Sequence, residues 1–124
     1  MQGYRDLSFF HLAYQLAMEI FEVSKRFPSE EKYSLTDQIR RSSRSVAANI
    51  AEGYRKRQYV KAFVNKMSDA DGEATETQVW LSVAKDCQYL PIEIQVRISQ
   101  GYDEVGRMLG GMMANPEKFL PKDR

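Results

Sequence analysis

The chain has little of what disulfides and metal centres require. Its 124 residues include one cysteine, Cys87, and one histidine, His11. One cysteine cannot form a disulfide within the chain, and one cysteine with one histidine cannot complete the ligand set of a structural zinc site. A chain without disulfides is typical of a reducing compartment, so we expect the protein to stay in the cytoplasm.

Long apolar runs are also missing. No stretch approaches the ~20 apolar residues that a membrane-spanning helix needs, and the N-terminus shows no basic segment followed by an apolar one. We therefore expect no contact with a membrane. A content of 43% hydrophobic and 28% charged residues is typical of one globular domain, 1–124.

Catalytic groups are scarce as well. His11 falls on a polar helical face and Cys87 behaves as a small apolar group, so neither has a partner for nucleophilic catalysis. Asp69, Glu73 and Glu76 share one helical face, but ferritin-like metal sites also need Glu-x-x-His pairs, which the chain lacks. The sequence therefore predicts no enzyme, no metal and no cofactor.

What the chain does contain is apolar residues at the helical period, and no strand-like alternation competes with it. Pro28 and Pro91 mark two of the connections, because proline cannot continue a helix. Short connections between four helices imply an all-α fold, an up-down-up-down four-helix bundle. The predicted segments are helices at about 6–27, 36–54, 58–88 and 91–114, and a flexible tail at 115–124.

The second predicted helix carries small residues on its packing face, so a neighbouring helix can approach it closely. Ser34 or Thr36 is its expected N-cap. Gly53 fits either a helix end or a close contact, and Asn49 is expected to hydrogen-bond a neighbouring helix or loop. The predicted core stripe of the third helix is Tyr59, Phe63, Met67, Ala70, Ala74, Thr77, Leu81 and Ala84.

Two apolar strips, one on the first helix and one on the third, lie outside the helix faces that are predicted to pack into the core. One bundle interior does not account for them, so they are candidates for contacts between subunits. We therefore predict a homo-oligomer. The predicted interface residues are Phe10, Tyr14 and Phe21 of the first helix and Val79, Trp80 and Val83 of the third.

Positive charge is concentrated in one segment. From Arg40 to Lys66 the chain has eight lysines and arginines against Glu52 alone, a local charge of +7 in a chain of net charge +1. Guanidinium groups offer paired donors to phosphate, and tyrosines nearby can stack on an unpaired base. The candidate stacking residues are Tyr54 and Tyr59, and the candidate nucleic-acid-binding residues are Arg40, Arg41, Arg44, Arg55, Lys56, Arg57 and Lys61.

Two other hypotheses explain the same cations. In the first, the arginines pair with Asp69, Glu73 and Glu76 inside the bundle or between subunits. The protein is then a scaffold that binds another protein through the Trp80 strip or the fourth helix. In the second, the cations bind some other anion.

Several motifs resemble one bacterial family. The pattern lies within residues 5 to 113. It consists of Gln38, Arg40-Arg41, Ser45-Val46, Asn49-Ile50-Ala51-Glu52-Gly53 and Arg57, then Phe63, Ala70-x-Gly72, Glu76-Thr77-Gln78 and Tyr89-Leu90. It resembles the bacterial four-helix bundle family, also called the 23S ribosomal RNA intervening-sequence protein family. This family is similar in architecture to the accessory variability proteins of diversity-generating retroelements.

The resemblance implies a homopentameric barrel that binds RNA or DNA. Asp69 and Glu73 depart from the family pattern, which tends to have an aliphatic residue and a serine there. These carboxylates argue against a simple anionic ligand on that part of the third helix.

Overall fold

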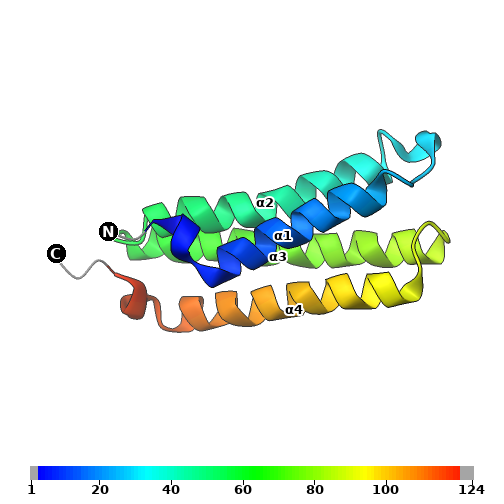
Figure 1. The fold of residues 1–124 in the computed structure, drawn as a ribbon. Helices are drawn as coiled ribbons and strands as arrows, with labels where there is room; N and C mark the ends of the chain where they lie inside the picture. Colours follow the sequence, from blue (N-terminus) through cyan, green and yellow to red (C-terminus); the bar gives the residue numbers. More distant parts are fainter. Residues whose placement is uncertain (1–2, 121–124) are drawn as a thin grey trace.

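The computed structural model describes residues 3–120, and in this part of the chain the structure is all-α with no strand (Figure 1). Its four long helices are α1 (Ser8–Ser24), α2 (Leu35–Arg55), α3 (Val60–Asp86) and α4 (Ile92–Ala114). Three short 3-10 segments, η1 (Tyr4–Asp6), η2 (Ser29–Glu31) and η3 (Pro116–Phe119), flank or connect them. The predicted all-α fold is confirmed.

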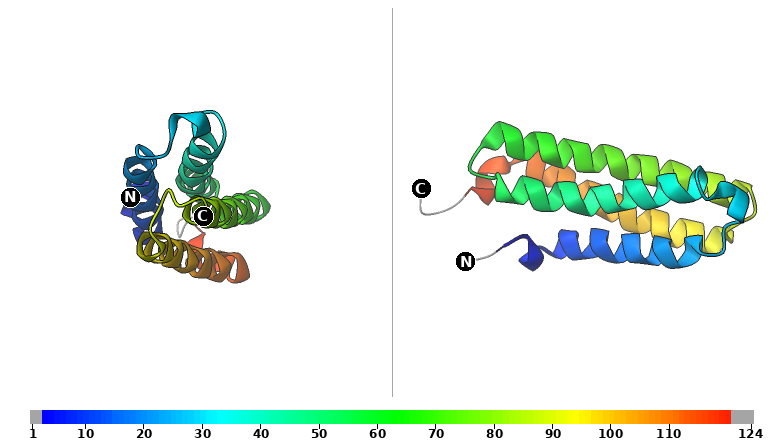
Figure 2. Two further views of the ribbon diagram at one scale, coloured as in Figure 1. Left: turned by 90° about the vertical axis from the view of Figure 1, so that its right-hand side faces the viewer. Right: turned by 90° about the horizontal axis from the view of Figure 1, so that it is seen from above.

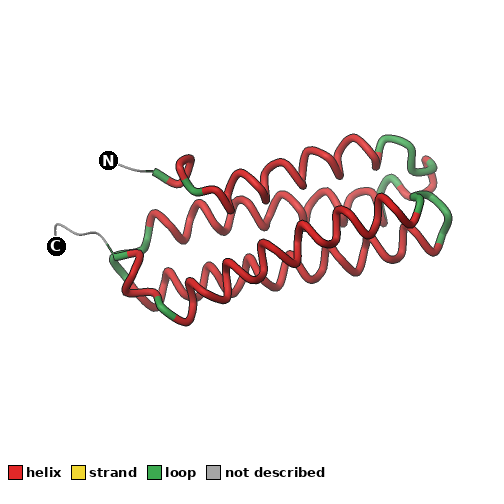
Figure 3. The backbone as a smooth tube through the Cα atoms, turned by 60° about the horizontal axis from the view of Figure 1, so that its bottom comes forward, coloured by secondary structure: helices red, strands yellow, loops and turns green. Residues whose placement is uncertain are grey.

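The helices form a square, antiparallel bundle. α2 packs between α1 and α3, and α4 closes the square against α3 and α1 (Figure 2). Short connections join successive helices at the two ends of the bundle (Figure 3). The α2–α3 turn lies at the same end as η1 and η3, whereas the α1–α2 and α3–α4 connections lie at the other end.

One hydrophobic core runs the length of the bundle, and each helix contributes residues at the helical period. Fully buried side chains include Ile20 of α1, Ile39 of α2, Phe63 of α3 and Ile98 of α4. Burial of a large apolar side chain contributes about 1.5–3 kcal/mol before its entropy cost is counted. The core stripes predicted from periodicity therefore hold the four helices together.

The third helix differs from its prediction at both ends. Tyr59 was expected in the core, but it is 63% exposed and precedes the first turn of α3 with extended backbone angles. At the other end, Gln88 has φ 68° and the N–H of Tyr89 bonds the carbonyl of Ala84. This is a Schellman motif, which ends the helix at Asp86.

The first helix also ends earlier than predicted, at Ser24 instead of Phe27. The N–H groups of Lys25, Arg26 and Phe27 bond carbonyls three residues back instead of four. A tightened last turn is a common way to end a helix, and Pro28 prevents its continuation.

The C-terminal tail was predicted to be flexible from residue 115, and this is wrong for η3. The ring of Phe119 lies 6.1 Å from the ring of Phe63, so η3 packs on the end of the core. Residues 121–124 of the predicted tail lie outside the described residues. None of the helices from 3 to 120 is both long enough and apolar enough to cross a membrane.

Candidate nucleic-acid interface

Arg41 faces α3, where it is paired with carboxylates. One terminal nitrogen lies 3.3 Å from Oε1 of Glu73, and the other donates to Oε2 of Glu76, which also accepts the indole N–H of Trp80 at 3.0 Å. The Trp80 hydrogen bond, with that of Arg41, lowers the pKa of Glu76, while Glu76 raises the pKa of Arg41. The salt-bridge hypothesis is correct for Arg41, whereas Asp69 is in none of the ion pairs between residues 3 and 120.

Arg40 turns the opposite way and holds the end of α1. Its Nε donates to the hydroxyl of Ser24 at 2.8 Å, and its NH2 group donates to the carbonyl of Phe21 at 3.4 Å. Its guanidinium carbon lies 4.7 Å from the centre of the Phe21 ring. A cation at the carbonyl end of a helix is favourable because those carbonyls lack partners in the helix. Arg40 therefore has a structural role that the sequence did not reveal.

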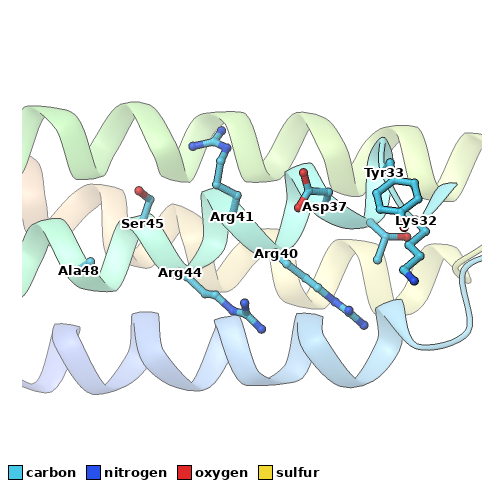
Figure 4. A pocket seen from close by; sticks show the side chains of 9 residues that line it. Lys32, Tyr33, Asp37, Arg40, Arg41, Arg44, Ser45 and Ala48 are labelled. Carbon is cyan, nitrogen blue, oxygen red and sulfur yellow. The ribbon is translucent and has the colours of Figure 1, made fainter.

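Arg44 lies one turn further along α2 and stays exposed. Its guanidinium carbon is 5.8 Å from the same Phe21 ring, and it has no carboxylate partner among the described residues. In Figure 4, Arg40 and Arg44 both extend toward α1, whereas Arg41 extends toward α3. The Phe21 ring thus orients two neighbouring guanidinium groups.

These arginines line an open hollow of about 630 Å³ on the outer face of α2, which we call the cationic hollow. Such a volume is in the range of small-ligand sites. Asp37 is its one acidic residue, and Tyr33 beside it is 85% exposed. The complete lining is Lys32, Tyr33, Thr36, Asp37, Arg40, Arg41, Arg44, Ser45 and Ala48.

A second group of cations lies at the α2–α3 turn; these residues, Arg55, Lys56, Arg57 and Lys61, are the turn cations. Three of them are exposed, and Arg57 is partly buried because its guanidinium lies 4.1 Å above the Tyr54 ring and donates to the Tyr54 carbonyl. Tyr54 is itself buried, so it cannot stack on a base. Tyr59, which is exposed, remains the aromatic residue of this turn.

The eight cations from Arg40 to Lys66 therefore divide into two classes. Arg41 is paired with Glu73 and Glu76, and Lys66 lies 3.4 Å from Glu52. Within residues 3–120, the other six cations have no carboxylate partner. Two of these six, Arg40 and Arg57, are partly buried and donate to backbone carbonyls. The other four are exposed and open to an external anion; they are Arg44, Arg55, Lys56 and Lys61.

The predicted subunit-interface residues fall in different environments. Phe21 is covered by the cations of Lys25, Arg40 and Arg44. Trp80 is partly buried against the core, whereas Val79 is 51% exposed. The remaining predicted residues are Val83, which is partly buried against the core, and Phe10 and Tyr14, which line a hollow between α1 and α2.

Asn49 and Gly53 were predicted to be structural, and the structure assigns them different roles. The amide of Asn49 donates to the carbonyl of Ser45 in its own helix at 3.0 Å, so the predicted bond to a neighbouring element is wrong. Gly53 lies within α2 and permits close approach of α3, because a Cβ there would lie 2.8 Å from Cβ of Lys66. A buried polar contact between α2 and α3 is made instead by Thr77, whose hydroxyl donates to that of Ser42 at 2.8 Å.

Lys32 and Tyr33 belong to the cationic hollow but were missed, because residues 29–34 read as a charged connection. A cation next to an aromatic residue just before a helix was the available signal. The ammonium of Lys32 lies 5.4 Å from the centre of the Tyr33 ring. The loop therefore adds a cation and an exposed ring to the site.

A comparison with protein-family models matches residues 5–111 to the 23S rRNA-intervening sequence protein family. The chain belongs to this family. The predicted family is thereby confirmed, and the match includes α1, α2, α3 and nearly all of α4. A comparison with curated proteins gives no match.

A solved structure supports the same assignment. It is the 1.70 Å crystal structure of a protein with unknown function from the S23 ribosomal protein family of Bacteroides thetaiotaomicron VPI-5482. The two chains are 27% identical with a TM-score of 0.76, over 86% of this chain and 95% of that one. Neither this description nor that of the 23S rRNA-intervening sequence family names an enzymatic activity.

Proposed function

We propose that this member of the 23S rRNA-intervening sequence family is a non-enzymatic, cytoplasmic oligomer that binds the phosphates of RNA or DNA. The observation that carries the proposal is that six of the eight cations from Arg40 to Lys66 have no carboxylate partner within residues 3–120. Unpaired arginines and lysines attract a polyanion because binding releases its condensed counterions. A cation that is already paired with a carboxylate within the fold contributes much less to the affinity for phosphate.

The proposed site has two parts. Arg44 and Arg40 supply the cationic hollow, and the turn cations supply the end of α2. At 1.5 Å per residue, Arg44 and Arg55 are roughly 16 Å apart along the helix. This separation exceeds the Debye length of ~8 Å at physiological salt, so the two parts make separate contacts along an extended ligand.

Arg41 is left out of the proposed site. Its pairing with Glu73 and Glu76 favours the alternative hypothesis for that residue, in which arginines stabilise the bundle. A scaffold that uses all its arginines in this way does not fit the remaining cations. The alternative role as a protein-binding scaffold therefore rests on the exposed apolar residues alone.

Self-association extends the proposal, and the family resemblance favours a pentamer. Val79 is half exposed on the outer face of α3, with Val83 one turn further along. Apolar residues in such a position favour contact with another subunit. Assembly would bring several copies of the cationic surface onto one nucleic acid, which raises affinity without new contacts.

Fluorescence anisotropy with labelled RNA and DNA at low salt tests the proposal. The variant Arg55→Ala/Lys56→Ala/Lys61→Ala should bind more weakly than the parent, and so should Arg44→Ala. Arg107→Ala is the control for Arg44→Ala, since it removes an exposed arginine of α4 that is paired with Glu104 and lies outside the proposed site. Equal affinities of the parent and both site variants would contradict the proposal.

A further inference from the structure

The cationic hollow continues into a second hollow of about 400 Å³ between α1 and α2, which we call the apolar hollow. Arg44 and Ala48 line both, so they mark the junction. One end of the combined groove is cationic and the other is aromatic. The lining of the apolar hollow is Tyr4, Phe10, Tyr14, Ala17, Met18, Arg44, Ala47, Ala48 and Ala51.

The apolar hollow has a small-residue side and an aromatic side. Ala47, Ala48 and Ala51 come from α2, and their short side chains leave room against the helix. The Phe10 ring lies 6.0 Å from the Tyr14 ring, and Tyr14 is 54% exposed. An aromatic ring with open surface in a hollow of this size suits a flat, weakly polar ring.

The junction places a cation beside that ring-binding space. Arg44 is exposed, has no carboxylate partner among residues 3–120, and is oriented by Phe21. Arg40 lies one turn away with its guanidinium over the same Phe21 ring. A ligand that fits both halves has a planar ring joined to an anionic group, which is the chemistry of a nucleotide.

We propose that the combined groove binds an unpaired nucleotide of an RNA or DNA strand, its base in the apolar hollow against Tyr14 and its phosphate on Arg44 and Arg40. This inference rests on the proposed function and makes it specific for strands with unpaired bases. In a duplex the bases are stacked and paired, so only the phosphates reach the cations. Tyr33, at the far end of the cationic hollow, offers a second exposed ring to a neighbouring base.

The test compares a short fluorescein-labelled single strand, the same strand in a duplex, and the same strand with abasic sites. Each probe is made both as RNA and as DNA, so that the experiment shows which of the two nucleic acids the groove binds. The unmutated protein should bind the single strand more tightly than the duplex or the abasic strand. The Tyr14→Ala variant should lower the affinity for the single strand by about 5- to 150-fold, which is the range of one lost stacking contact, and leave duplex binding unchanged.

Two further variants separate stacking from folding. Tyr14→Phe keeps the ring and should retain single-strand binding, whereas Gln15→Ala changes the next exposed residue of α1 and serves as a control. Circular dichroism should show equal helicity for all variants. Light scattering should show that Tyr14→Ala leaves the molecular mass unchanged.

Each contrary result has a distinct meaning. Equal binding of single strand, duplex and abasic strand, or no effect of Tyr14→Ala, overturns the base site while the proposed phosphate binding stands. A changed mass for Tyr14→Ala assigns the apolar hollow to a subunit contact and overturns the base site as well. No binding of any strand overturns both proposals.

Discussion

The hydroxyl of Tyr89 donates a hydrogen bond of 3.0 Å to Oε2 of Glu31, and this contact joins the α1–α2 connection to the α3–α4 turn. The other oxygen of Glu31 accepts the hydroxyl of Ser34 at 2.6 Å and the N–H of Leu35 at 3.3 Å. Ser34 or Thr36 was expected to cap α2. Ser34 does stand at the N-cap position, but the carboxylate of Glu31 makes the capping bond. One side chain thus caps a helix and ties two loops together.

Glu31 should make the stability of the bundle depend on pH in the acid range. The hydrogen bond from Ser34, followed by those from Tyr89 and Leu35, lowers the pKa of Glu31 from 4.5. Its contribution is therefore present above pH 4.5 and is lost as the pH falls through the lowered pKa. Thermal melts of the parent should show that the melting temperature falls as the pH is lowered, and Glu31→Gln should show a smaller fall. An identical acid profile in Glu31→Gln would mean that other groups control it.

The same contact has an alkaline counterpart. Glu31 raises the pKa of Tyr89 to about 12, because the protonated phenol donates a hydrogen bond to the Glu31 carboxylate. This contribution is present below pH 10 and is lost as the pH rises through about 12. The melting temperature of Tyr89→Phe should therefore change less than that of the parent between these pH values. If the melting temperatures of Tyr89→Phe and the parent changed equally over this pH range, the raised pKa of Tyr89 would be contradicted.

Gly53 and Gly72 form a matched pair for measuring how closely α2 and α3 pack. A Cβ at Gly53 would collide with Cε of Met67 and lie 2.8 Å from Cβ of Lys66, whereas a Cβ at Gly72 meets no atom within 4 Å. Gly53→Ala should lower the free energy of unfolding by about 1–3 kcal/mol through overpacking. Gly72→Ala should raise it by roughly 0.5–1 kcal/mol, since alanine favours the helix. Denaturant titration measures both, and equal effects would exclude a close contact at Gly53.

Arg41→Ala should lower the stability of the bundle without lowering its affinity for nucleic acid. Loss of its contacts with Glu73 and Glu76 should cost roughly 0.2–1 kcal/mol, because the pair is partly exposed to solvent. Affinity for nucleic acid should stay near that of the parent. A large loss of affinity with unchanged stability would return Arg41 to the binding site.

The helical period predicted the helices and most of the core, because burial of an apolar stripe dominates the energy of a bundle. It did not predict the roles of the arginines. Adjacent residues on a helix differ by 100°, so Arg40 meets α1 and Arg41 meets α3, and only the neighbouring helices decide which finds a carboxylate.

Two other differences have local causes. Tyr59 fits the stripe of α3 by spacing, but it precedes the first turn and points to solvent. The carbonyl of Ser45 lies within reach of Asn49 in the same helix, so the amide needs no partner elsewhere. Local alternatives of this kind are hard to rank from spacing alone, because amides compete readily for nearby backbone groups.

The central claim, that the cations of α2 and its turn bind nucleic acid, is tested most directly by the salt dependence of affinity. With two to four phosphate contacts per subunit, log affinity for a single strand against log salt should have a slope of about −1.4 to −2.8 per subunit engaged. The Arg44→Ala/Arg55→Ala variant should flatten that slope by about 1.4 with unchanged fold and mass. Undetectable binding by the unmutated protein at low salt, or an unchanged slope in the double variant, would contradict the account.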